Sequence, residues 1–221
     1  MNVLLLNGSP HEQGCTDTAL QEAGRMLEQA GIRTTRFWIG SEPLAGCSGC
    51  GYCARAGKCC HDDRVNVFLD AAKDADGFIF GAPVHFASAS ASMIAFLDRS
   101  FYADHCAGLN RFAFKPGAAI VSARRAGTSA ALDELNKYLL YAQMPIVSSR
   151  YWNMVHGHTP AQVCQDEEGM QIMRVLGRNM AWMLNSLKIA ADAGLPLPEQ
   201  ESASAPTISA EGGASGCKTY G

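Results

Sequence analysis

The stretch VLLLNGSPHEQGCTDTALQEAG, residues 3–24, carries the strongest indication of the fold. It opens with the apolar run Val3–Leu6, which predicts a short buried strand. The turn-forming sequence NGSP at 7–10 ends that strand. Apolar residues then recur at helical spacing over Thr18–Ala30, and Gly31 closes the helix. The stretch therefore predicts a strand, a polar loop and a helix in succession.

The same alternation continues along the chain. Further strands are expected at Thr34–Ile39, Gly77–Gly81, Gly117–Ser122 and Pro145–Ser148. Further helices are expected at Val67–Ala75, Ser90–Phe101, Ala130–Tyr141 and Met170–Ala193. Strands and helices that alternate at this spacing predict an α/β fold, with a parallel sheet covered by helices on both faces. We expect a single domain at 1–194, followed at 195–221 by a flexible tail of low complexity, rich in Pro, Glu, Ser, Ala and Gly.

Composition narrows the classes of function. A chain of 221 residues that is 48% hydrophobic can bury one sizeable core. Its formal net charge of −3 leaves no electrostatic footprint for nucleic acid, and no apolar run is long enough to cross a bilayer. The first residues lack the basic region of a signal peptide, so we expect a cytoplasmic protein with reduced thiols and with no nucleic-acid or membrane partner.

The loop after the first expected strand has the features of a phosphate site. Ser9, Thr16 and Thr18 offer hydroxyl groups. Gly8 and Gly14 permit close approach of the backbone, and the start of the following helix supplies free N–H groups. An ordinary turn between strand and helix is the alternative. No GxxxxGK[ST] motif is present, so nucleotide hydrolysis is not expected.

A second motif, GCSGCGYCARAGKCC at 46–60, contains five of the nine cysteines. Thiolates at two-residue intervals, as in its C-x2-C-x2-C run, can wrap a [4Fe–4S] cube, and the glycines give the backbone the freedom to do so. Structural zinc more often uses two separated cysteine pairs, and a reducing compartment disfavours disulfides. Thiols that hold no metal are a further alternative. The candidate ligands are Cys47, Cys50, Cys53 and Cys59, with Cys60 adjacent to the last.

Five stretches resemble the flavodoxin-like family of NAD(P)H-dependent FMN reductases and, within it, the iron–sulfur flavoproteins. They are LLLNGSP…T, CSGCGYC…GKC, GAPVHFASASASMIAFLDR, KPGAAIVSARRAGT and YWNMVHG. The resemblance implies a five-stranded flavodoxin-like sheet, FMN where the strand order reverses, and a homodimer or homotetramer. It also places the cysteine-rich segment 46–63 as an insertion after the second strand.

The resemblance further implies a set of residues around FMN. Those carried over to its phosphate are Ser9, Pro10, Thr16 and Thr18. Those carried over to the isoalloxazine ring and its far edge are Pro83, Val84, His85, Phe86, Arg124, Arg125, Ala126 and Gly127. His11 and Cys15, in the phosphate loop, depart from the family pattern, which has a basic residue and an Asn there. The family pattern also favours Cys59 over Cys60 as fourth ligand, because Cys59 follows Gly-Lys.

The leading functional hypothesis is an FMN-dependent oxidoreductase that passes electrons between FMN, a [4Fe–4S] cluster and an acceptor, with NAD(P)H as co-substrate. The acceptor would be a flavin, a quinone or a protein. One alternative is an NAD(P)H-dependent FMN or quinone reductase without a cluster. The other is a non-enzymatic electron carrier, for which a strongly acidic docking face is expected and the net charge of −3 offers little support. No catalytic acid–base residue is required, because the protein mainly positions and tunes the cofactors.

Two further features of the sequence can each be interpreted in more than one way. The stretch Tyr151–Gly157 either lines the flavin mouth or a subunit contact, or places Trp152 and Met154 in the core. Cys106, like the other cysteines outside the cluster segment, is expected to be a buried or idle thiol.

Overall fold

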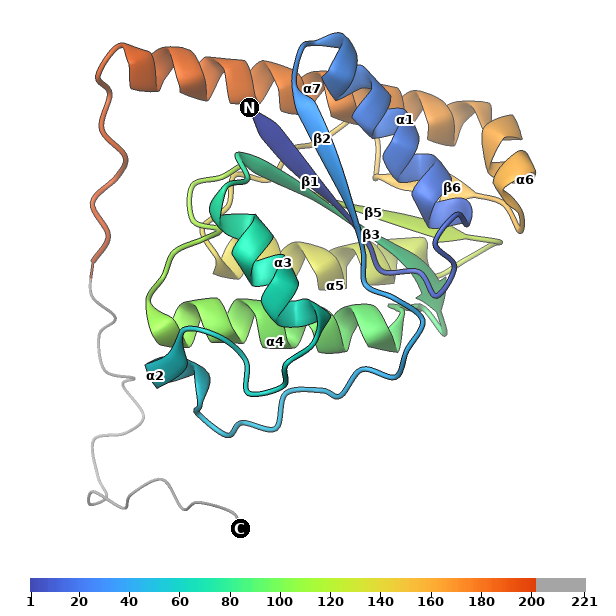
Figure 1. Cartoon of the computed structure of the whole chain (residues 1–221). Coiled ribbons are helices and arrows are strands. Elements are labelled where there is room, and N and C mark those ends of the chain that lie inside the picture. Colours follow the sequence, from blue (N-terminus) through green and yellow to red (C-terminus); the bar gives the residue numbers. More distant parts are fainter. Residues whose placement is uncertain (202–221) are drawn as a thin grey trace, which may run out of the picture.

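The sheet contains five parallel strands in the order β2-β1-β3-β5-β6, in a computed structural model that describes residues 1–201 (Figure 1). Their bounds are β1 Asn2–Asn7, β2 Arg33–Trp38, β3 Gly77–His85, β5 Gly117–Ala123 and β6 Met154–His156. A two-residue strand β4 (Ser88–Ala89) adds an antiparallel pairing to β3. This is the strand order of flavodoxin-like folds, so the predicted five-stranded parallel sheet is confirmed.

Helices cover both faces of the sheet, as predicted. They are α1 Cys15–Gln29, α2 Cys53–Ala56, α3 Arg64–Lys73, α4 Ala91–Ala107, α5 Thr128–Tyr141, α6 Pro160–Gln165 and α7 Glu167–Asp192. Strand β1 shows how both faces are filled, because alternate side chains of a strand point to opposite faces. Leu4 and Leu6 pack with α3, α4 and α5, whereas Val3 and Leu5 pack with α1 and α7. All four side chains are buried.

The predicted fifth strand at Pro145–Ser148 is wrong. Only Ile146 forms an isolated bridge there, to Gly117, and the chain leaves the sheet before it returns as β6. Between the bridge at Ile146 and the start of β6, the side chain of Asn153 takes the place of the missing strand. Its Nδ2 donates to the carbonyl of Ala119 on β5 at 3.1 Å. A side chain thus makes the ladder hydrogen bond that an unbroken strand would have made with its backbone.

Most predicted elements lie within a few residues of their observed bounds. The largest differences are at the carboxyl ends of two elements: α4 continues six residues beyond Phe101, and β3 continues four residues beyond Gly81. Of the predicted tail, residues 195–201 are exposed and contain no helix or strand, and the remainder lies outside the described residues. Within the described part of the chain, no helix is both long and apolar enough to cross a bilayer.

Candidate functional site

Three predicted loops meet at one edge of the sheet. They follow the carboxyl ends of β1, β3 and β5, which all point to the same end of the parallel sheet (Figure 1). The strand order reverses between β1 and β3, because β2 lies outside β1 while β3 and β5 follow on the other side. Open α/β sheets bind ligands in the crevice at such a point.

The loop after β1 is shaped by the side chain of Asn7. Its Oδ1 accepts from the backbone N–H of Ser9 at 3.0 Å, and its Nδ2 donates to the carbonyl of Glu12 at 3.0 Å. The N–H of His11 donates to Ser9 Oγ at 3.1 Å, which curls the loop further. Helix α1 then begins after Gly14, which provides no side-chain cap. The first N–H groups of α1 are therefore available to an anion, which the helix dipole also favours.

The other predicted phosphate-loop residues lie at different depths. Thr16 is buried, and its hydroxyl lies 2.8 Å from that of Ser122 at the end of β5. The hydroxyl of Thr18 donates to the carbonyl of Gly14 at 3.1 Å. Cys15 is half-buried and its thiol donates to Gly157 O at 3.7 Å; burial raises the pKa of this thiol. The predicted Pro10 is exposed next to these groups.

The second loop is a tight hairpin between β3 and β4. Its two turn residues, Phe86 and Ala87, have φ values of 53° and 61°. Positive φ at both turn positions matches the twist of the strands, but it is strained for side chains other than glycine. Phe86 is fully exposed at the tip, beside the exposed His85. The hairpin is held from α5 by Glu134, whose Oε2 accepts from Ala89 N at 2.9 Å and Ser88 Oγ at 2.8 Å.

The third loop, residues 124–127, lies directly against this hairpin. A Cβ added to Gly127 would come within 2.8 Å of Ala87 Cα and 3.0 Å of Val84 Cγ1. Gly127 has a φ of 95°, so a glycine is needed for both the conformation and the space. Arg124 and Arg125 are exposed, and neither forms an ion pair within the described residues.

Taken together, these loops suit FMN. Uncapped N–H groups and hydroxyls at the start of α1 can hold a phosphate, and two unpaired guanidinium groups lie at the neighbouring strand end. The structure brings together the predicted residues 83–86 and 124–127, and Ser90 Oγ ties the hairpin to the first loop by donating to Gly8 O at 2.8 Å.

The cysteine-rich segment forms a separate centre at the other half of α4 (Figure 1). All four predicted ligands line one hollow, together with Cys60. Cys53 is buried and Cys59 half-buried, whereas the other three are exposed. Gly49 and Gly51 flank Cys50 with φ values of 67° and 69°, as the expected tight wrap requires. Arg99 and Tyr102 of α4 close the hollow from the protein side.

Two buried arginines fasten this segment to the core. Arg99 donates to both oxygens of Asp63, at 2.8 and 2.9 Å, and to Cys59 Sγ at 3.2 Å. Burial opposes its charge, but the bonds to Asp63 and Cys59 raise its pKa. Arg111 donates to the carbonyl of Gly57 at 3.0 Å and pairs with Asp104 at 3.1 Å. The motif gave no signal for these anchors, which lie 40 or more residues further along the chain.

The thiols of the segment differ in acidity. Burial, with the neighbouring Cys106 of α4, raises the pKa of Cys53 to about 11. The backbone N–H of Tyr52, followed by Cys60, lowers the pKa of Cys50. The sulfurs of Cys50 and Cys60 are 3.5 Å apart. Cys106, predicted to be a buried or idle thiol, is half-buried and lies beside the candidate ligand Cys53, which its position in the sequence did not indicate.

The donor set fits an iron–sulfur cluster. Thiolates are the usual ligands of such clusters, and several of them surround one hollow here. Among residues 1–201, no three His, Cys, Asp or Glu side chains are placed to hold a single metal ion. A cube differs from a single ion in this respect, because each of its four irons takes its own cysteine.

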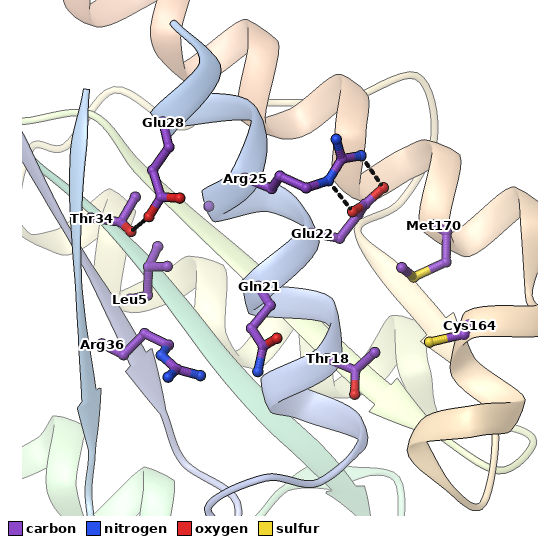
Figure 2. Close-up of a pocket in the computed structure, with 11 residues that line it drawn as sticks. Leu5, Thr18, Gln21, Glu22, Arg25, Glu28, Thr34, Arg36, Cys164 and Met170 are labelled. Atoms are coloured by element: carbon purple, nitrogen blue, oxygen red, sulfur yellow. Dashed lines mark hydrogen bonds and ion pairs between the residues drawn. The ribbon is translucent and has the colours of Figure 1, made fainter. Parts of the chain in front are cut away.

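A cavity of about 600 Å³ lies elsewhere, between α1, β2 and the start of α7 (Figure 2). Of the predicted cofactor residues, only Thr18 lines it. Figure 2 shows Glu22 paired with Arg25, and the carboxylate of Glu28 reaching Thr34. The remaining cation of the lining, Arg36, pairs with Asp17 outside the cavity. Each charged group of the cavity therefore already has a polar partner, and we assign the cavity no part in cofactor binding.

The stretch 151–157 divides between surface and core. Tyr151 and Trp152 are exposed and lie with their rings 4.8 Å apart. Asn153, Met154 and Val155 are buried at the edge of the sheet. Of the two interpretations left open, a core position holds for Met154, whereas Trp152 lies on the surface.

Comparisons with known proteins agree with this architecture. The family model described as NADPH-dependent FMN reductase matches residues 1–159. An iron-sulfur flavoprotein of Methanocaldococcus jannaschii is 29% identical over 195 residues, which is 85% of this chain and 100% of that protein. An iron-sulfur flavoprotein of Archaeoglobus fulgidus is 28% identical over 194 residues, 83% of this chain and 97% of that protein. The solved structure of an archaeal flavodoxin has a TM-score of 0.57 at 16% identity, covering 84% of this chain and 99% of that one.

The fold and the loops at the strand ends, with these similarities, define a flavodoxin-like, FMN-dependent oxidoreductase. The chain belongs to the NADPH-dependent FMN reductase family, and its similarity to the two iron-sulfur flavoproteins covers 85% and 83% of the chain. The family resemblance inferred from the sequence motifs is thereby confirmed.

Proposed function

We propose that the protein is an FMN-dependent oxidoreductase that carries a [4Fe–4S] cluster and passes electrons between flavin, cluster and an external acceptor. The observation that carries this proposal is the convergence of all five motif cysteines, the four predicted ligands among them, on one hollow in a chain of the FMN reductase family. The proposed ligands are Cys47, Cys50, Cys53 and Cys59. FMN supplies two-electron chemistry when bound, and the cluster exchanges electrons singly.

The chain's own residues would bind and orient the flavin. The N–H groups at the start of α1, with Ser9 and Thr16, would hold the phosphate. The hairpin at 83–86 and the loop at 124–127 would bracket the ring, with Arg124 or Arg125 facing an anionic or carbonyl edge. Pro10, His11, Cys15 and Thr18 complete the proposed phosphate loop.

Helix α4 would fix the distance between the two centres. Its cap Ser90 bonds to the phosphate loop, and Arg99, nine residues later, bonds to the cysteine segment. At 1.5 Å of rise per residue, Ser90 and Arg99 are about 14 Å apart along the axis of the helix. A helix with buried side chains keeps this spacing constant.

The external partners follow from the same chemistry. We propose NAD(P)H as the two-electron donor, and a flavin, a quinone or a redox protein as acceptor. We further propose a homodimer or homotetramer that works in the cytoplasm, where thiols stay reduced.

Anaerobic reconstitution with iron, sulfide and FMN tests the proposal. We expect about four irons and four sulfides per chain, from the stoichiometry of the cube, together with bound FMN and NAD(P)H-driven reduction of an acceptor. Bound FMN and turnover without iron would instead indicate the cluster-free reductase. Bound FMN with no turnover with any acceptor would indicate an electron carrier.

A further inference from the structure

The side chain of Arg99 is completely buried at the wall of the cysteine hollow, with 0% of its surface exposed. Each of its nitrogens has a partner. Nη1 and Nη2 donate to the carboxylate of Asp63, and Nη1 also reaches the carbonyl of Ala45 at 3.3 Å. Nε donates to Cys59 Sγ at 3.2 Å. The two Nη atoms of the guanidinium group thus bind the carboxylate of Asp63, and Nε is left to bind the sulfur of Cys59.

Cys59 and Cys60 differ in how firmly they are held. The side chain of Asn66 brackets Cys59, because its Oδ1 accepts from Cys59 N at 2.8 Å and its Nδ2 donates to Cys59 O at 3.1 Å. Together with the bond from Arg99, these contacts fix both the backbone and the sulfur of Cys59. Cys60 is exposed, and its sulfur faces that of Cys50.

We propose that Arg99 is a positioning residue of the cysteine centre, which presents Cys59 as the fourth ligand and raises the reduction potential of the cluster through its bond to that sulfur. This inference rests on the proposed cluster. Reduction adds one electron, and hence one negative charge, to the centre. A donor to a ligating sulfur stabilises the more negative state, so it shifts the potential upward. Asp63 opposes this effect, because its carboxylate offsets the charge of the guanidinium.

Two substitutions should therefore shift the potential in opposite directions. Arg99→Lys keeps a cation for Asp63 but loses the planar fork that serves carboxylate and sulfur together. We expect at least a tenfold fall in the equilibrium constant for one-electron reduction, which corresponds to about 59 mV. Asp63→Asn keeps an acceptor for Arg99 and removes the opposing charge, so we expect the potential to rise.

Arg111→Lys is the matched control. Arg111 is also a buried arginine that pairs with a carboxylate and anchors the same segment, but its bonds go to Asp104 and to the Gly57 carbonyl, with none to a sulfur. We expect its potential to equal that of the wild type. Each full-length variant and the wild type are reconstituted with FMN, iron and sulfide, and the reduction potential of the cluster is measured by a redox titration followed spectroscopically. The amount of bound FMN shows whether each variant has folded.

The outcomes separate the two proposals. A wild type that binds FMN but retains no iron overturns the cluster and this inference with it. A loaded cluster whose potential is the same in Arg99→Lys and the wild type overturns this inference alone. If Arg99→Lys does not bind FMN, Asp63→Asn decides: a raised potential supports the role of Arg99, and an unchanged or lowered one overturns it.

Discussion

Gly127 lies against Ala87 so closely that a single added methyl group would sit 2.8 Å from the Ala87 Cα. The two residues belong to loops that are 40 positions apart in the chain and are both proposed to bracket the flavin. Gly127 also has a φ of 95°. The shape of the proposed flavin site therefore depends on a glycine that offers no functional group of its own.

Gly127→Ala should weaken FMN binding. The added Cβ strains the backbone by about 1–2 kcal/mol and pushes the hairpin away from its place. We expect at least a tenfold higher Kd for FMN, measured by quenching of flavin fluorescence. Gly108→Ala is the control, because Gly108 has a φ of 62° with open space around it and caps α4 away from the flavin loops. Equal affinities in the two variants would contradict a specific role for the contact.

The buried pair Thr16–Ser122 should show strong coupling in stability. Thr16→Val leaves the Ser122 hydroxyl buried without its partner, which costs about 1–3 kcal/mol. The double variant Thr16→Val with Ser122→Ala removes both polar groups, so it should cost less than the sum of the single variants. Urea unfolding of the four proteins gives the coupling energy. Additive losses would show that the two hydroxyls act independently.

Cysteine alkylation in the cluster-free protein should follow the acidity of each thiol. With a pKa of about 11, Cys53 is about 0.1% thiolate at pH 8, against about a quarter for an ordinary cysteine. We expect iodoacetamide to modify Cys50 first and Cys53 last, as read by peptide mass spectrometry. Because only the thiolate reacts, modification of Cys53 should accelerate as the pH rises toward 11. Early modification of Cys53 at pH 8 would contradict its burial.

The raised pKa of Cys53 also has a consequence for stability. The folded state holds this proton more tightly than the unfolded chain, so the stability due to the protonated thiol is fully present below the ordinary cysteine pKa. It is lost as the pH rises from there through about 11. Cys53→Ala should lack this part of the pH dependence, as measured by urea unfolding of both cluster-free proteins.

The two adjacent cysteines should differ in their effect on iron content. Cys59→Ser removes a ligand that Arg99 and Asn66 hold in place, so we expect most of the iron and labile sulfide to be lost after reconstitution. Cys60→Ser should retain both. Iron and sulfide assays, normalised to bound FMN, compare the two variants. The opposite order would identify Cys60 as the fourth ligand.

The layers of the fold were predicted well, because apolar strands and amphipathic helices alternate clearly along the part of the chain that forms the buried sheet. In β1, neighbouring leucines enter opposite cores, and the chain shows this as a plain apolar run. The prediction of a fifth strand at 145–148 was wrong for a local reason. Residues 145–148 touch the sheet only at one bridge, and Asn153 replaces the missing backbone contact with its amide. No propensity rule anticipates a ladder position filled by a side chain.

Motifs indicated the two proposed centres but not the residues that support them. Cysteine spacing is local, so the segment could be found from its letters alone. Arg99, Arg111 and Glu134 act through contacts that only the tertiary structure creates, and each lies outside the loop that it holds. Arg99 stood within a family-like stretch, yet nothing in that stretch pointed toward a sulfur 40 positions earlier.

Helix α4 has one more consequence, for how such a chain can change over time. Because a helix advances by about 100° per residue, one residue inserted between Ser90 and Arg99 would swing Arg99 away from Cys59 while Ser90 stayed on the phosphate loop. A loop can accommodate an insertion by bulging outward, whereas in helix α4 an insertion would rotate every residue that follows it. The cysteine segment and the loop after β1 both depend on the same rotation along α4, so we expect insertions and deletions to be tolerated only in the turns outside this helix.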